Sequence, residues 1–164
     1  MRAINNITPL SDRDREKHLG KIPRFSLVVI LLSNIFWLTA CERTLYGNER
    51  AAVLEYSETI TDNLFAGFTA NDYVVFSHDF DSDMHERVPA VDFAAWKQEV
   101  DNKIGSYLSR NIDQVSQADE FYVVVYQAKF EKEEQVTVTE AFHSDQSLAF
   151  LSFESGKYSW SAWE

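Results

Sequence analysis

The stretch that decides the fold is Phe121-Tyr122-Val123-Val124-Val125-Tyr126-Gln127-Ala128-Lys129-Phe130-Glu131. Its side chains alternate with period two, which is typical of a β-strand that lays one face on a core. The core face carries Tyr122, Val124, Tyr126, Ala128 and Phe130. The other face starts with Phe121, Val123 and Val125 and turns polar at Gln127 and Lys129. Because a sheet with two apolar faces must cover both, we expect a homodimer through the sheet, or a strand or tail folded over this face.

Further strands flank this segment. The residues before it predict a strand over 107–115, and those after it predict strands over 136–142 and 148–153. Turns over 132–134 and 144–146 separate these strands, and short polar turns are typical of antiparallel neighbours. One strand alternates Val136, Val138, Glu140 and Phe142 with Thr137, Thr139, Ala141 and His143. The tail over 158–163 alternates aromatic and small residues, which suits a last strand or an aromatic edge exposed for a partner.

Three helices are expected before the strands. Over 51–66, apolar side chains recur every three or four residues, and Gly67 offers a stop. Thr69 to Asp72 resembles a capping box that opens a second helix, whose buried stripe runs from Tyr73 to Met84 and which Val88-Pro89 breaks. Pro89 separates that helix from a third one that ends near Gly105. Helices followed by antiparallel strands predict an α+β domain, with three N-terminal helices on a sheet of about four strands.

The N-terminal region predicts export and lipid attachment. Residues 25–38 are apolar and uncharged, but 14 residues are fewer than the roughly 20 that cross a bilayer, and a basic stretch precedes them. The run ends at Leu38-Thr39-Ala40-Cys41, which resembles the lipobox of prokaryotic lipoproteins, in which the cysteine thiol receives a lipid before cleavage. We therefore expect a signal peptide over 1–40, a lipidated Cys41 with a tether up to residue 50, and one domain over 51–164. The alternative is an uncleaved signal-anchor helix.

The charge of the chain limits the classes of partner that it can bind, and its cysteine content limits how the domain is stabilised. Residues 1–24 hold six of the 15 basic and three of the 26 acidic side chains, so the rest of the chain carries nine and 23. A surface this acidic repels phosphate backbones, which excludes nucleic acid as a favoured partner. Cys41 is the single cysteine, so no intrachain disulfide forms and the domain folds on its core. Apolar residues make up 45% of the chain, which is enough for such a core.

Several short motifs lie along the expected domain: Asn71-Asp72-Tyr73, Asp79-Phe80, Met84, Gly105, Ser109-Arg110 and Tyr126-Gln127-Ala128-Lys129-Phe130-Glu131. Together they resemble an uncharacterised family of prokaryotic lipoproteins whose fold is similar to the nuclear transport factor 2 superfold. The resemblance covers roughly residues 51–156 and implies a cone of three helices wrapped by a curved antiparallel sheet. It implies no activity, because the superfold hosts isomerases, dehydratases and non-catalytic modules alike.

Three kinds of site have candidate residues in the sequence: a metal site, an acid–base site and an apolar pocket. The acidic run from His78 to His85 lacks the glycine and glutamate of a calcium loop, and its two histidines lie about 10 Å apart on a helix, so we expect no metal and no other cofactor. An acid–base site would use His78, Asp79 or Tyr122, each more simply a surface or core residue. A pocket for an apolar ligand would be lined by Phe80, Met84, Trp96, Tyr122 and Tyr126.

Together these features predict a lipid-anchored, non-catalytic binding or interaction module of the cell envelope. Cys41 would tie it to the outer membrane if the source has one, and otherwise to the outer face of the cell membrane. Its partner would be a small apolar ligand or an envelope protein. Two alternatives stay open: a small enzyme of isomerase or hydratase type that uses one buried acid in the cone, and a purely structural envelope protein.

Overall fold

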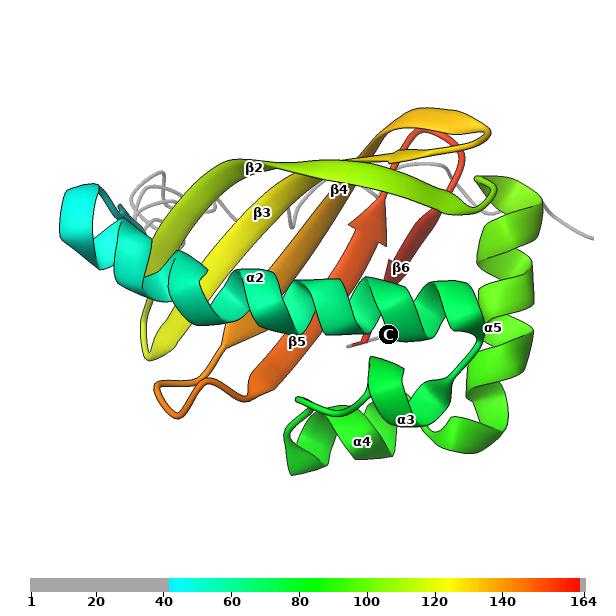
Figure 1. Ribbon diagram of the computed structural model, residues 1–164, viewed down its shortest axis with the longest axis horizontal. Coiled ribbons are helices and arrows are strands. Elements are labelled where there is room, and N and C mark those ends of the chain that lie inside the picture. The colour runs from blue at the N-terminus through cyan, green and yellow to red at the C-terminus, as the bar shows by residue number, and fades with distance from the viewer. Residues whose placement is uncertain (1–41, 163–164) are drawn as a thin grey trace, which may run out of the picture. The chain divides into compact units, whose positions relative to one another are not determined.

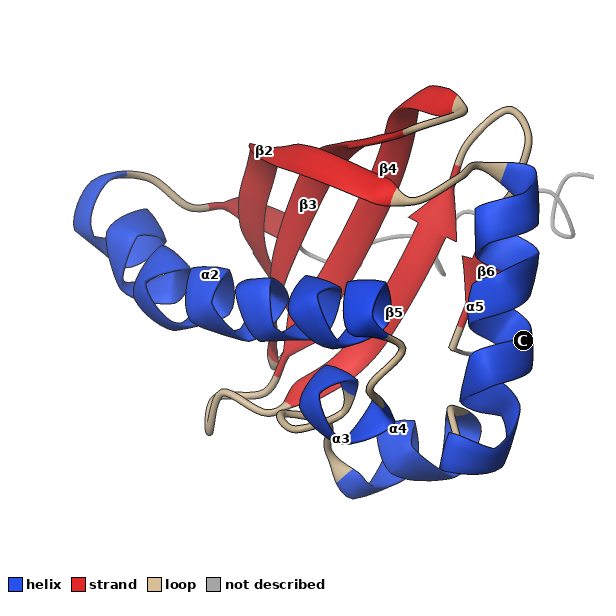
Figure 2. Ribbon diagram, turned by 45° about the vertical axis from the view of Figure 1, so that its right-hand side comes forward, coloured by secondary structure: helices blue, strands red, loops and turns tan. Residues whose placement is uncertain are grey.

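The computed structural model describes residues 42–162, which form an α+β domain. Within this range, six strands form one antiparallel sheet in chain order. They are β1 (Glu42–Thr44), β2 (Tyr107–Ala118), β3 (Phe121–Phe130), β4 (Glu133–Phe142), β5 (Leu148–Glu154) and β6 (Ser159–Ser161). The helices are α2 (Gly47–Ala70), α3 (Tyr73–Phe76), α4 (Ser82–Arg87) and α5 (Ala90–Lys103). Figure 1 shows α2 lying across the sheet, with α5 near one end of α2 and the short α3 and α4 below it. The same arrangement is visible from a second side (Figure 2).

The predicted combination of helices and antiparallel strands is confirmed, but the helix boundaries differ. The first helix begins four residues earlier than expected and passes through Gly67 to Ala70. Gly67 serves packing instead of termination, since a Cβ there would stand 2.2 Å from the backbone nitrogen of Phe76. The helix ends where Asn71 adopts a left-handed conformation with φ of 55°.

The second helix was expected to be continuous over 73–84, and this is wrong. The segment between Ser77 and Asp81 leaves the helix and pairs with the start of β5. The backbone nitrogen of Asp81 donates to the carbonyl of Leu148 at 3.0 Å, and that of Leu148 donates to the carbonyl of Asp79 at 2.7 Å. Asp72 and Asp81 then cap α3 and α4 separately, while Thr69 lies inside α2 and forms no capping box.

The sheet has two more strands than expected, and both are three residues long. Residues 42–50, expected to be a tether, form β1 and the first turn of α2. β1 pairs with the end of β2, from Glu42 opposite Ala118 to Thr44 opposite Ser116. β1 is too short for its periodicity to be seen in the sequence, whereas β6 falls in the tail over 158–163, where a last strand was one of two expectations. Residues 42–50 therefore belong to the folded domain, and Cys41 lies outside the described residues.

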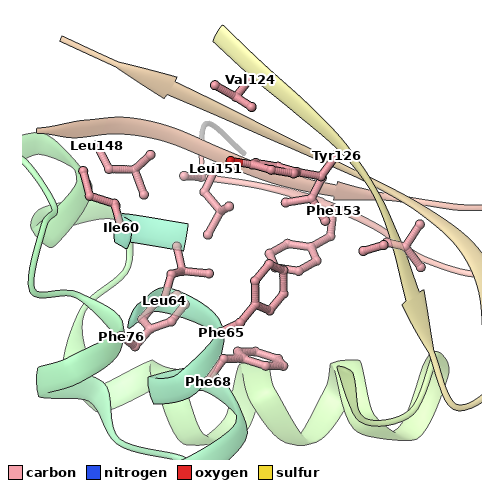
Figure 3. Close-up of a cluster of buried hydrophobic side chains, with 14 of the residues drawn as sticks. Ile60, Leu64, Phe65, Phe68, Phe76, Val124, Tyr126, Leu148, Leu151 and Phe153 are labelled. Atoms are coloured by element: carbon pink, nitrogen blue, oxygen red, sulfur yellow. The ribbon is translucent and has the colours of Figure 1, made fainter. Parts of the chain in front are cut away.

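The concave face of the sheet is filled with aromatic side chains. Phe65 and Phe68 of α2 and Phe153 of β5 are each no more than 2% exposed. Trp96 of α5 lies edge-on to Phe68, with ring centroids 5.2 Å apart, and 4.4 Å from Trp160 of β6. Figure 3 shows how the three phenylalanine rings and the aliphatic side chains of α2 and β5 meet between helix and sheet. This packing fixes α2 against the strands that carry the site described next.

Candidate functional site

Two adjoining hollows form a groove at one rim of the domain. The first has a volume of about 510 Å³ and is lined by Tyr56, Thr59, Ile60, His78, Asp79, Phe80, Asp145, Gln146 and Ser147. The second has a volume of about 370 Å³ and is lined by Arg43, Leu45, Glu49, Ala52, Val53, Tyr56, Tyr122, Ser144 and Gln146. Tyr56 and Gln146 line both, so the hollows adjoin at these two residues. We call this pair of hollows the rim groove.

Three segments that are distant in sequence hold the rim groove together. One wall is the first half of α2, and the other is the turn between β4 and β5. The link between α3 and α4 closes one end, where the backbone bonds around Leu148 join it to β5. Tyr56 lies between the hollows with its ring edge-on to Phe142 at 5.6 Å. Burial raises the pKa of Tyr56 to about 12, so its hydroxyl keeps its proton at neutral pH.

The charged side chains of the rim groove are already paired locally. His78 Nδ1 lies 2.9 Å from Asp79 Oδ1, and Arg43 Nη1 lies 2.7 Å from Glu49 Oε2. The side chain of Asp145 accepts two hydrogen bonds from Ser147, one from the Ser147 hydroxyl at 2.7 Å and one from the Ser147 backbone nitrogen at 3.1 Å. These bonds lower the pKa of Asp145. The groove thus offers a mixed polar and aromatic lining instead of one concentrated charge.

A second feature lies beneath α2 and was not anticipated. Glu140 of β4 is fully buried on the concave face, opposite Val124 of β3 and Leu151 of β5. Its Oε2 lies 2.7 Å from the hydroxyl oxygen of Thr61 on α2. The Thr61 hydroxyl also lies 3.0 Å from the hydroxyl of Tyr126 and 2.7 Å from the carbonyl oxygen of Ser57. We call Ser57, Thr61, Tyr126 and Glu140 the buried acid cluster.

Proton counting at Thr61 gives the protonation state of Glu140. The Thr61 hydroxyl has one proton and two acceptor lone pairs. The carbonyl oxygen of Ser57 can only accept, so the Thr61 proton serves that contact. If Glu140 were ionised, its oxygen would face the Thr61 oxygen at 2.7 Å with no proton between them. A neutral Glu140 that donates to Thr61 removes this conflict, and Tyr126 donates the third bond.

The surroundings of Glu140 favour the same neutral form. Burial away from water raises the pKa of Glu140 to about 8, and this effect outweighs the opposing effects of the Thr61 hydrogen bond and of the Arg110 charge. Burial also raises the pKa of Tyr126 far above its ordinary value. Within residues 42–162, buried atoms without a hydrogen bond include Glu140 Oε1, Ser57 Oγ and Arg110 Nε. A buried, neutral carboxylic acid with one oxygen unpaired is therefore held between α2 and the sheet.

The residues predicted from sequence fall into two places. His78, Asp79 and Phe80 line the first hollow of the rim groove, and Tyr122 lines the second. The other three predicted pocket residues, Met84, Trp96 and Tyr126, are 0%, 9% and 0% exposed and belong to the packed core. The structure therefore does not bring the five predicted pocket residues together around one space. Cys41 lies outside the described residues.

Sequence reasoning missed the buried acid cluster, although signals for it were present. Glu140 is an acid in an otherwise apolar row of β4, and such a row faces the core. Ser57 and Thr61 stand four residues apart on the buried stripe of α2, between Val53 and Leu64. A lone carboxyl on one core face and two hydroxyls on the facing one together indicate a buried polar cluster.

In residues 42–162, no helix is both long and apolar enough to span a bilayer. The same residues contain no group of three or more His, Cys, Asp and Glu side chains able to hold a metal ion. Comparison with protein-family models, with curated proteins and with solved structures finds no match to this chain.

Proposed function

We propose that this chain is a lipid-anchored, extracytoplasmic binding module of the cell envelope that takes a small ligand in its rim groove. The observation that carries the proposal is that two hollows adjoin at Tyr56 and Gln146, which line both of them. Their volumes, about 510 and 370 Å³, fall in the range of small-molecule sites, which is about 300–1,000 Å³. The lining combines aromatic faces with hydrogen-bonding groups, so the ligand would have an apolar part and a polar end.

The anchor and the finer fold belong to the same proposal. The lipobox-like tetrad ending at Cys41 and the apolar run before it support export and lipid attachment. Because β1 begins at Glu42, a lipid on Cys41 would lie directly beside the domain. Helices packed on one face of an antiparallel sheet also agree with a nuclear transport factor 2-like cone, and we propose that architecture for the domain.

Ligand binding is tested with variants that fill or spare the rim groove. Thr59 is an exposed residue of α2 that lines the first hollow, so Thr59→Trp should fill it without disturbing the core. Glu55→Trp is the matched control, because Glu55 is exposed on the same helix and lines neither hollow. The assay is thermal unfolding of the purified chain against a library of small amphiphiles, since a ligand of the native state raises the melting temperature.

We expect at least one compound to stabilise the wild type and Glu55→Trp but not Thr59→Trp. Equal stabilisation of all three variants would place the ligand elsewhere. A library without any stabilising compound would favour the purely structural envelope protein.

One observation favours a second candidate, an enzyme of isomerase or hydratase type. Glu140 is a neutral, buried carboxylic acid of raised pKa, which is the state that a general acid needs near neutral pH. Against this role, Glu140 is 0% exposed and lines neither hollow of the rim groove. Turnover that is lost in Glu140→Gln and retained in Thr59→Trp would favour the enzyme over the binding module.

A further inference from the structure

The buried acid cluster joins α2 to the sheet through a bond that depends on one proton. With Glu140 neutral, all three short contacts of the Thr61 hydroxyl contain a proton. With Glu140 ionised, the Thr61 hydroxyl faces two acceptors, the carboxylate and the carbonyl of Ser57, and can donate to one of them only. The carboxylate would also be a buried charge, which is costly unless a cation pairs with it.

Arg110 is placed to respond to that charge. Its guanidinium holds α2 through Asp62, with Nη1 2.8 Å from Oδ1, and through Glu58, whose carbonyl oxygen accepts from Nη2 at 3.3 Å. The same group lies over the ring of Tyr126 at 5.2 Å, next to the buried acid cluster. In the described part of the chain, its Nε and Oε1 of Glu140 are both buried without a hydrogen bond. Arg110 thus has bonds to α2, a buried donor without a hydrogen bond, and a position over the ring of Tyr126.

Apart from Arg110, the groups named here around Glu140 are an acid, a phenol and an aliphatic side chain, and none of them carries a positive charge. From α2, Glu58 contributes a negative charge that favours the neutral acid. From β3, Tyr126 contributes a hydroxyl that stays protonated, and from β5 the paired residue is the apolar Leu151. Arg110 of β2 is therefore the cation that favours ionisation.

We propose that the buried acid cluster is a pH-sensitive latch, in which neutral Glu140 holds α2 on the sheet and its ionisation draws Arg110 away from α2 and loosens that helix. The proton leaves Glu140 for solvent, and the released carboxylate takes the Arg110 guanidinium in place of Asp62 and Glu58. Tyr56, Thr59 and Ile60 of the same helix segment line the rim groove. If the proposed function holds, loosening of α2 also changes the ligand site; the latch itself requires only the cluster.

Hydrogen exchange of the full-length chain between pH 5 and pH 8 tests the latch. An open state in which Glu140 is ionised gains population by up to about tenfold per pH unit in this window, because the open state binds fewer protons. After correction for intrinsic exchange, protection of the α2 amides around Ser57 to Leu64 should therefore fall by roughly 400-fold between pH 5 and pH 8. In Glu140→Gln the corrected protection should be independent of pH, and in the control Glu55→Gln, an exposed acid on the same helix, it should fall as in the wild type.

Equal pH dependence in the wild type and Glu140→Gln would overturn the latch. Should Glu140→Gln fail to fold, the wild type labelled with ¹³C at its glutamate carboxyls decides instead. One carboxyl carbon that titrates above pH 7 is the expected result, and a full set that titrates below pH 6 contradicts it. Both readouts are independent of any ligand, so failure of the binding proposal leaves this test intact.

Discussion

Trp96→Ala tests whether the concave face is filled or open. Trp96 is 9% exposed, and its ring meets Phe68, Phe153 and Trp160 with centroids 5.2, 5.7 and 4.4 Å away. A buried aromatic side chain removes about 200 Å² from water, or about 5 kcal/mol at 25 cal/mol per Å². A compact unfolded chain already buries part of that area, which lowers the figure to about 3–4 kcal/mol.

A lost hydrogen bond adds to this cost. The Trp96 indole nitrogen donates to the Tyr158 hydroxyl at 3.0 Å, and breaking such a bond costs about 1 kcal/mol. We therefore expect Trp96→Ala to lower the free energy of unfolding by about 4 kcal/mol, within the roughly 3–5 kcal/mol range of large-to-small core changes.

The assay is urea unfolding followed by far-ultraviolet circular dichroism, so that loss of the tryptophan does not alter the signal. Val91→Ala is the control: Val91 lies on the same helix but is 83% exposed, and its change should be within about 0.5 kcal/mol. A cost below about 1.5 kcal/mol, together with binding of an apolar dye by the wild type, would mean that Trp96 borders an open cavity and would refute the filled core.

Three further changes address the helix contact, the buried acid and the outer face of the sheet. Gly67→Ala should destabilise by about 1–3 kcal/mol, because its Cβ would meet the Phe76 backbone; equal melting temperatures would contradict this contact. Glu140→Gln should raise the free energy of unfolding at pH 7 by about 3 kcal/mol, measured by urea unfolding. The reason is that the contribution of neutral Glu140 to wild-type stability is full below about pH 4.5 and is lost as the pH rises to about 8. An unchanged or lower free energy of unfolding in this variant would count against a neutral acid. Val123→Lys should dissociate the homodimer predicted through the outer face of the sheet, as measured by sedimentation. A wild type that sediments as a monomer would contradict this prediction.

Periodicity in the sequence was sufficient for the main elements of the fold. The alternation over 121–131 corresponds to β3, and the predicted turn at 144–146 lies between β4 and β5. The turn predicted over 132–134 is shorter than expected, because Glu133 and Glu134 already belong to β4. Periodicity failed to predict the structure where tertiary contacts override local preference. The second helix divides because the residues around Asp79 bond to Leu148, a partner 69 positions away that no local pattern reveals.

The candidate site could be predicted only in part. His78, Asp79, Phe80 and Tyr122 are close to the rim groove, because residues near turns tend to line rims. The groove itself depends on the turn between β4 and β5 reaching α2, which follows from packing and not from sequence spacing. Glu140 was visible as an acid in an apolar row, but its protonation follows only from the contacts of Thr61.

Intact mass spectrometry of the chain purified from its own membranes tests the central claim of a lipid-anchored module most directly. We expect a mature chain that begins at Cys41 and carries the added mass of a thioether-linked lipid, and a Cys41→Ser variant that keeps its leader and gains no lipid. A mature N-terminus at another residue, or an unmodified Cys41 thiol in the wild type, would contradict lipid anchoring at this position.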